Sequence, residues 1–135
     1  MKKFLLPTLA IALFTLPACE DDHDEHSHAT ITFLHPADNE TIALADADAV
    51  DIHVRFEWEG EEGEAVEVKL IAEGQADSLL IDFDLHQHDA LYEFEELVNL
   101  SSFPAGTEFH LEAKAFENHE GTEFVESSIH FTLVP

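Results

Sequence analysis

The chain has 135 residues, with 30 Asp and Glu against five Lys and Arg, ten His and a formal charge of −25 at pH 7. Such an acidic surface repels phosphate backbones and anionic lipid headgroups, which excludes nucleic-acid binding and polybasic docking to a membrane. The chain is also 45% hydrophobic, and its apolar residues continue to the C-terminus. Acidity therefore does not indicate disorder here, and one folded domain is expected.

The N-terminus has the pattern of a bacterial lipoprotein signal peptide. Lys2 and Lys3 precede an apolar run over residues 4–16, which is too short for a permanent membrane span. The segment 16–19, Leu-Pro-Ala-Cys, resembles a lipobox. That resemblance implies removal of the first 18 residues and lipidation of Cys19, the single cysteine of the chain, so the domain has no disulfide. The alternative is an ordinary secretory signal with an incidental cysteine.

Residues 19–28 are predicted to form an acidic tether between the lipid anchor and the domain. Residues 20–28 include no apolar side chain, so nothing offsets the entropy of ordering them. An acidic block after a lipidated cysteine resembles the surface-export signal of Bacteroidota lipoproteins. It implies an anchor in the outer membrane and exposure at the cell surface, with the periplasmic face as the alternative. His23, His26 and His28 are either incidental or candidate ligands for Zn, Cu or Ni.

From residue 29 to residue 135 the apolar pattern has a period of two, which indicates β-strands. No segment of helical length carries an apolar stripe with a period of 3.6. Strands with one apolar face and short connections predict an all-β domain, an antiparallel β-sandwich. About seven strands are expected, over residues 30–34, 50–59, 65–72, 79–85, 91–98, 109–115 and 125–133.

Two turn regions refine this prediction. The Pro-Ala-Gly turn at 104–106, which leads into an alternating strand, resembles the E–F corner of immunoglobulin-like and fibronectin-type domains. The segment 34–42 resembles the first strand and turn of such modules. With the lipobox, the chain resembles the uncharacterised immunoglobulin-like lipoproteins of Bacteroidota, which often carry a His-x-His motif, matched here by His86 and His88. The resemblance implies an immunoglobulin-like sandwich and brings no established activity.

Strand alternation predicts where the histidines lie. The tether and the loops after the second, fourth and sixth expected strands share one end of the sandwich. This end should gather six histidines, namely His23, His26, His28, His86, His88 and His119. In an extended chain His86 and His88 point to one side, a spacing that a Zn or Cu ion can bridge with a third ligand from a loop. The alternative is a chance His-x-His in a His-rich protein.

A second pair of histidines follows from the expected hairpin around residue 120. In the simplest register Lys114 faces Glu126 and His110 faces His130, with Cβ atoms about 4.5–5.5 Å apart. The two imidazoles form a second candidate site. The alternative is a pair of solvent-exposed side chains on a wet sheet face, and a register shift of two residues would separate them.

No catalytic motif is present: the sequence contains no Gly-rich phosphate loop, GxSxG, HExxH or CxxC. We therefore expect no enzyme but a non-catalytic envelope lipoprotein, an immunoglobulin-like binding or spacer module with an unknown protein or glycan partner. The alternative function is binding or buffering of Zn, Cu or Ni through His86, His88 and the tether histidines. Ten imidazoles also leave a pH response open.

Overall fold

The computed structural model describes residues 28–60, 63–74 and 78–135. The signal peptide, Cys19 and tether residues 20–27 lie outside the described residues. Among the residues described, no helix is long and apolar enough to cross a membrane. The strands are β1 (His28–His35), β2 (Glu40–Ala43), β3 (Val50–Glu59), β4 (Ala65–Ala72), β5 (Leu79–His86), β6 (Leu91–Val98), β7 (Glu108–Phe116) and β8 (Phe124–Val134), with a short 3-10 helix, η1 (Leu44–Asp46), between β2 and β3.

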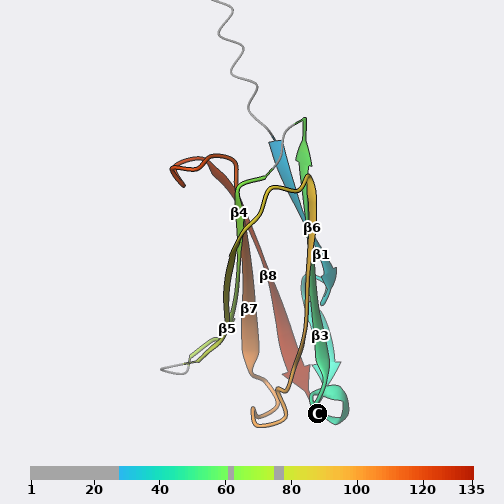
Figure 1. The fold of residues 1–135 in the computed structure, drawn as a ribbon. Helices are drawn as coiled ribbons and strands as arrows, with labels where there is room; N and C mark the ends of the chain where they lie inside the picture. The colour runs from blue at the N-terminus through green and yellow to red at the C-terminus, as the bar shows by residue number, and fades with distance from the viewer. Residues whose placement is uncertain (1–27, 61–62, 75–77) are drawn as a thin grey trace, which may run out of the picture.

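The strands form two sheets, with the orders β1-β3-β6 and β2-β8-β7-β4-β5. These sheets are the two layers of an elongated sandwich (Figure 1). The first matches the A-B-E strands of an immunoglobulin-like domain, and β5-β4-β7-β8 matches its C′-C-F-G strands. The predicted all-β sandwich is confirmed, and the expected bounds of β3, β4 and β6 agree with the structure to the residue.

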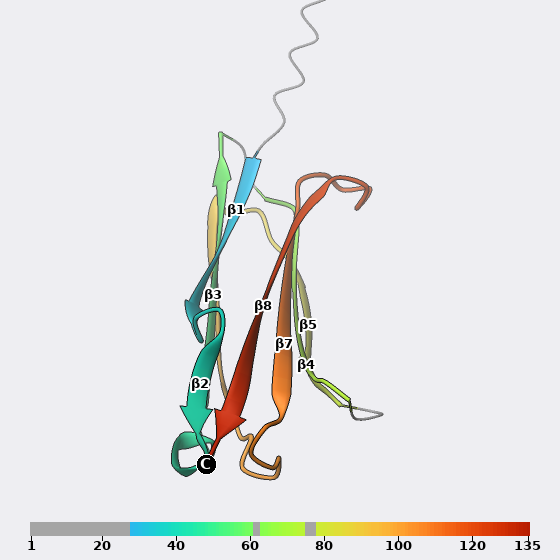
Figure 2. The same ribbon diagram turned by 180° about the vertical axis from the view of Figure 1, so that it is seen from behind.

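Strand β2 is the element that the sequence did not predict. Pro36 follows β1, and because proline has no N–H it cannot continue the hydrogen-bond ladder. Asn39 then takes a left-handed conformation with φ 61°, and the chain crosses to the second sheet. There β2 runs parallel to β8 (Figure 2), whereas the other strand pairs are antiparallel. Four residues are too few for an alternating pattern to be recognised.

The core lies between the sheets and follows the predicted alternation. Along β3 the side chains at Ile52, Val54 and Phe56 are fully buried, while their neighbours are more exposed. Phe109 and Phe131 stack from β7 and β8, with ring centroids 5.0 Å apart. Burying each large side chain contributes about 1.5–3 kcal/mol. No disulfide is needed to explain the packing of this core.

The two ends of the sandwich carry different connections. The start of β1 and the connections β3–β4, β5–β6 and β7–β8 lie at one end, which we call the tether end (Figure 1). The connections β4–β5 and β6–β7, with the C-terminus, lie at the opposite end, which we call the far end (Figure 1). The strand alternation inferred from the sequence therefore placed these loops correctly.

Candidate functional site

The first candidate site is a tether-end group formed by Glu64, His88 and His119. Each residue comes from a different connection between strands. The Oε2 atom of Glu64 lies 2.6 Å from Nδ1 of His119 and 3.9 Å from Nδ1 of His88. The two imidazole rings have centroids 6.0 Å apart. One carboxylate is thus shared by two of the histidines that the sequence assigned to this end.

The Glu64 carboxylate is less exposed than its two partners. Its side chain is 16% exposed, against 61% for His88 and 77% for His119. Its Oε2 atom is buried and has no hydrogen-bond partner, and its contact with His119 is an ion pair. A buried carboxylate oxygen without a donor is costly, and a cation bound to it would remove that cost.

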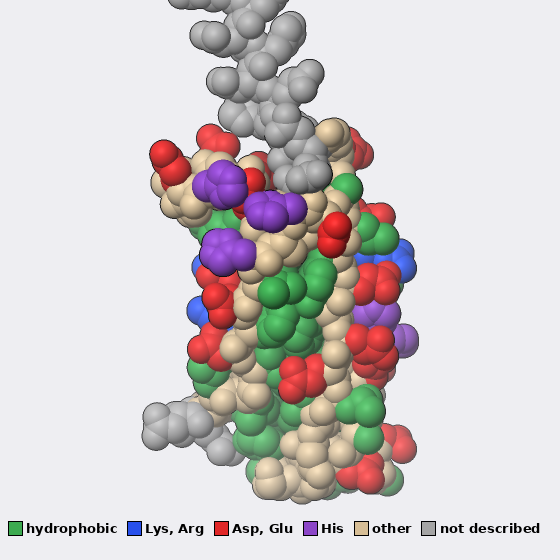
Figure 3. Space-filling view, in the orientation of Figure 1, with side chains coloured by type: hydrophobic (Ala, Val, Ile, Leu, Met, Phe, Trp, Pro, Cys, Tyr) green, Lys and Arg blue, Asp and Glu red, His purple; other side chains and the backbone are tan. Residues whose placement is uncertain are grey.

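His86 lies beside the same group. Together with Glu64 and His119 it lines a cavity of about 130 Å³ between β4, β5 and the β7–β8 connection. His86 pairs with Ala65 at the end of β5, and Asp84 of the same strand also lines the cavity. The structure therefore brings His86, His88 and His119 to one region, as predicted. Figure 3 shows histidine side chains gathered at this end of the molecule.

Backbone contacts position Glu64. Its N–H donates to the carbonyl of Phe116 at 3.2 Å, and its carbonyl accepts from the N–H of Gln87 at 3.1 Å. The preceding Gly63 backbone lies against the indole of Trp58, where an added Cβ would be 2.3 Å from a ring carbon. Glycine is therefore required at 63 by close approach. These contacts hold Glu64 between the two loops that carry His88 and His119.

Of the tether histidines, His23 and His26 lie outside the described residues. His28 is the first residue of β1, one position earlier than the expected domain start, and its backbone pairs with Glu59 of β3. Their participation in a site at this end remains a prediction.

The second candidate site is a sheet-face group formed by Glu73, His110 and His130. Strands β7 and β8 pair in the predicted register, with His110 opposite His130 and Lys114 opposite Glu126. Lys114 Nζ lies 3.3 Å from Glu126 Oε2. The imidazole rings of His110 and His130 stack with centroids 4.4 Å apart and an interplanar angle of 4°. This group lies on the outer face of the second sheet, toward the far end.

The backbone explains why the two rings are so close. The N–H of His130 donates to Asp38 Oδ1 at 3.1 Å, and its carbonyl accepts from the N–H of Asn39 at 2.7 Å. Both groups therefore point away from β7, so His110 and His130 form a non-hydrogen-bonded pair. In such pairs the Cα atoms are about 4.5 Å apart, against about 5.5 Å in hydrogen-bonded pairs. The register thus fixes the approach of the imidazoles.

Two carboxylates flank the stacked rings. Glu73 Oε1 lies 3.1 Å from His130 Nε2, and Glu112 Oε1 lies 3.5 Å from His110 Nδ1. The other ring nitrogen of His110, Nε2, is buried and has no hydrogen-bond partner. Glu112 lies two residues after His110 on the same face of β7, whereas Glu73 comes directly after another strand, β4. The β4–β7 pairing explains the position of Glu73. Ile71 pairs with His110, and Glu73 follows Ile71 by two residues, so it lies on the same face of the sheet.

The two groups differ in compactness. One ligand atom each from Glu73, His110 and His130 lie within 4.8 Å of one another, and among the described residues no other His, Cys, Asp or Glu trio meets this condition. At the tether end the carboxylate approaches both histidines, but the three ligand atoms do not converge to that extent. The sheet-face group is therefore the more complete ligand set.

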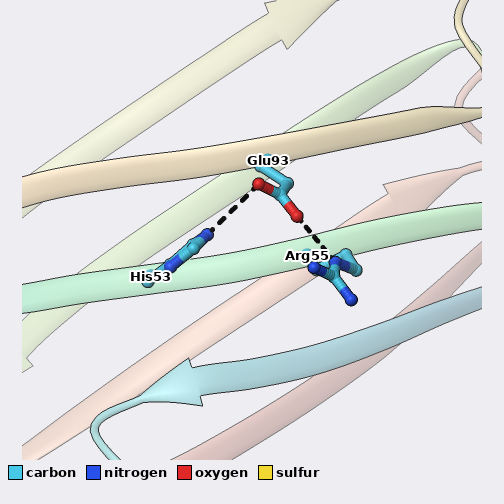
Figure 4. A network of polar contacts seen from close by, with 3 residues as sticks. All are labelled: His53, Arg55 and Glu93. Atoms are coloured by element: carbon cyan, nitrogen blue, oxygen red, sulfur yellow. Dashed lines mark hydrogen bonds and ion pairs between the residues drawn. The ribbon is translucent and has the colours of Figure 1, made fainter.

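A third polar network lies on the outer face of the first sheet (Figure 4). Glu93 of β6 receives a hydrogen bond from Arg55 Nε at 2.7 Å, and its other oxygen lies 3.5 Å from His53 Nε2. The Arg55 hydrogen bond, and then the charges of Arg55 and His53, lower the pKa of Glu93, although partial desolvation opposes them. Here the Arg55 guanidinium already pairs with the Glu93 carboxylate, so this network does not favour binding of a metal ion.

Comparison with known proteins gives information on the fold alone. No family model matches the chain, and no curated protein matches it. One similar solved structure is the crystal structure of an engineered protein, with a TM-score of 0.50 and 16% sequence identity. The match covers 80% of this chain and 20% of that one. At this identity the likeness supports the sandwich architecture alone.

Proposed function

We propose that the chain is a non-catalytic lipoprotein of the bacterial cell envelope, an immunoglobulin-like binding or spacer module displayed on the outer membrane. Cys19 carries the lipid in this proposal, and residues 20–27 link it to the domain. The observation that supports it most directly is the start of β1 at one end of an elongated sandwich (Figure 1). An anchor attached there leaves the far end directed away from the membrane, free for a protein or glycan partner.

The anchor is tested with Cys19→Ser in the full chain, expressed in a Bacteroidota host. The unaltered chain should incorporate labelled fatty acid and sediment with membranes, because two or three acyl chains give a lasting anchor. The variant should lose the label and leave the membrane fraction. Equal labelling and sedimentation of the two chains would contradict the proposal.

The location is tested by protease treatment of intact cells. Surface display predicts digestion without permeabilisation, and replacing the acidic residues at 20–25 with Ser should shift the protein to a protected position. A matched control replaces the acidic residues of strand β6, Glu93, Glu95 and Glu96, with Gln, which keeps the tether intact. Protection of the unaltered chain until the outer membrane is opened would instead assign the periplasmic face.

A second candidate function, transition-metal binding at the tether end, is favoured by the shared Glu64 carboxylate. Imidazole and carboxylate ligands suit Zn²⁺, Cu²⁺ and Ni²⁺. His86, His88 and His119 would supply the imidazoles, with His23 and His26 of the chain before β1 and His28, the first residue of β1, as further candidates. Binding of the ion would satisfy the buried oxygen of Glu64.

Equilibrium dialysis of the full chain against Zn²⁺ tests this second function. The double variant His88→Ala/His119→Ala should bind one equivalent of Zn²⁺ at least tenfold more weakly than the unaltered chain, while His53→Ala, which alters a histidine of the first sheet, should not change binding. Millimolar affinity in the unaltered chain, or equal loss in the His53→Ala control, would exclude a tether-end metal site.

A further inference from the structure

We infer that Glu73, His110 and His130 form a binding site for a divalent transition-metal ion on the outer face of the second sheet. The site takes one ring nitrogen from each histidine and one oxygen from Glu73. It is separate from the tether end, and it depends neither on the lipid anchor nor on the tether histidines. Zn²⁺, Cu²⁺ and Ni²⁺ are the ions that match two imidazoles and one carboxylate.

The separations fit a metal ion after small side-chain rotations. Zn²⁺ binds imidazole nitrogen at about 2.0–2.1 Å, which puts neighbouring ligand atoms of a tetrahedral ion about 3.3 Å apart. The distance of 3.1 Å between Glu73 Oε1 and His130 Nε2 is already close to this value. The full trio lies within 4.8 Å, so His110 needs to close the remaining gap. A tilt of the stacked rings about their χ2 bonds provides this movement without a change of the backbone.

The unpaired ring nitrogen of His110 also supports a metal site. Its Nε2 is buried and has no hydrogen-bond partner, which is costly for a polar atom. Its Nδ1 lies 3.5 Å from Glu112 Oε1. A histidine that binds a metal through one nitrogen commonly donates the other N–H to a carboxylate, which fixes the tautomer and ring orientation. The Glu112 carboxylate lies on the Nδ1 side of His110, which leaves the Nε2 atom for the ion.

The surroundings favour a cation that exchanges with solvent. Glu108 and Glu112 flank His110 along β7, and the chain as a whole carries a formal charge of −25. The side chains of His130 and Glu73 are 50% and 41% exposed, so solvent reaches the open side of the site. Three protein ligands with a free fourth position characterise accessible zinc sites, whereas structural zinc sites are closed by four.

The rigidity of the strands makes the site pre-organised. His110 and His130 are held by the β7–β8 ladder, and His130 is held further by Asp38 and Asn39. Glu73 follows β4, and its N–H donates to the carbonyl of Glu108 at 2.8 Å. All three ligands are thus tied to backbone hydrogen bonds of one sheet. Little ordering entropy is lost when the ion binds, which favours affinity.

The test is a Zn²⁺ titration of the full chain carrying Cys19→Ser, which removes the lone thiol as a competing ligand, followed by NMR of the histidine ring nitrogens. The resolved ring signals separate this site from the tether end in one experiment. We expect the His110 and His130 signals to shift together along one saturable binding curve. Glu73→Gln should weaken the apparent Zn²⁺ affinity that these signals report at least tenfold. His130→Ala should weaken the affinity reported by the remaining His110 signal to a similar extent.

The matched controls keep the sheet and remove other ligands. Glu126→Gln neutralises a carboxylate on β8 that pairs with Lys114, and His88→Ala/His119→Ala removes the tether-end imidazoles. Neither should change the Zn²⁺ response of His110 and His130. Thermal unfolding without metal shows whether each variant is folded. Because Glu73 lies at the surface, Glu73→Gln remains informative even if a histidine variant does not fold.

Three results would overturn the inference. The His110 and His130 signals could remain unchanged while other histidines shift, the Glu73→Gln variant could bind like the unaltered chain, or the Glu126→Gln control could weaken binding equally. A response of the tether-end histidines alone would support the second candidate function and exclude this site. A response of His110 and His130 alone would support this site and exclude the tether-end site.

Discussion

The tether-end group and the sheet-face group contain the same side-chain types but are held in different ways. At the tether end His88 and His119 lie on separate connections and meet at the Glu64 carboxylate. On the sheet face His110 and His130 lie on paired strands and stack at 4.4 Å. Strand register therefore produces the tighter ligand set, because a ladder fixes both position and separation, whereas loops fix only the end of the molecule at which a residue lies.

The largest expected effect is a loss of unfolding free energy when the core beneath the sheet-face group is altered. Phe109 is fully buried and stacks on Phe131, and these residues adjoin His110 and His130 on the opposite face. Phe109→Ala should lower the free energy of unfolding by about 3–5 kcal/mol. Phe124→Ala, at a ring that is 46% exposed at the tether end, should cost much less. Urea denaturation measures both, and equal losses would contradict the comparison.

A smaller effect is expected at Gly63, which positions the tether-end carboxylate. The added Cβ of Gly63→Ala would lie 2.3 Å from the Trp58 ring, so the loop or the indole must move, at a cost of about 2–3 kcal/mol, the upper part of the range for overpacking. Trp58 is the single tryptophan, so its fluorescence reports the change directly. Gly60→Ala is the control, because it has open space and a left-handed φ of +90°, and should cost about 1 kcal/mol. The interpretation fails if Gly63→Ala costs no more than this control.

Asn118 offers a test of how the His119 loop is held. Its Oδ1 accepts from the N–H of Thr122 at 3.1 Å, and its Nδ2 donates to Thr122 Oγ1 at 2.9 Å. Asn118→Ala should cost about 1 kcal/mol and speed hydrogen exchange of the Thr122 amide. Asp38→Ala removes a comparable bond to His130, yet the β7–β8 ladder should preserve the ring stack. Unchanged exchange at Thr122 would show that the loop is held by other contacts.

The smallest effect concerns the Glu93 network on the outer face of the first sheet, where Arg55 pairs with the carboxylate. The lowered pKa of Glu93 stabilises the fold above the ordinary carboxyl pKa of 4.5, and this contribution is lost as the pH falls through the lowered pKa. Arg55→Gln should raise the pKa toward 4.5. His53→Gln should raise it less, because the Arg55 hydrogen bond is the largest cause of the shift. Carboxyl NMR through the acidic range measures both, and a larger shift in His53→Gln would reverse this ranking.

Much of the fold was predictable because its strands alternate strictly. The bounds of β3, β4 and β6 were correct, and the hairpin register that opposes His110 and His130 was correct. Strand β2 was not found, since its four residues depend on pairing with β8 rather than on a pattern of their own. Glu73 was not connected with His130, because that contact requires the β4–β7 register in addition to the β7–β8 register.

The sequence by itself determined the all-β class and the end of the sandwich at which His86, His88 and His119 lie. These properties follow from local periodicity and from the alternation of strand direction, which need no knowledge of side-chain packing. Only the tertiary structure decided which carboxylate meets which histidine. Glu64 and Glu73 reach their partners across strands distant in the chain, so their positions depend on pairing, register and loop geometry together.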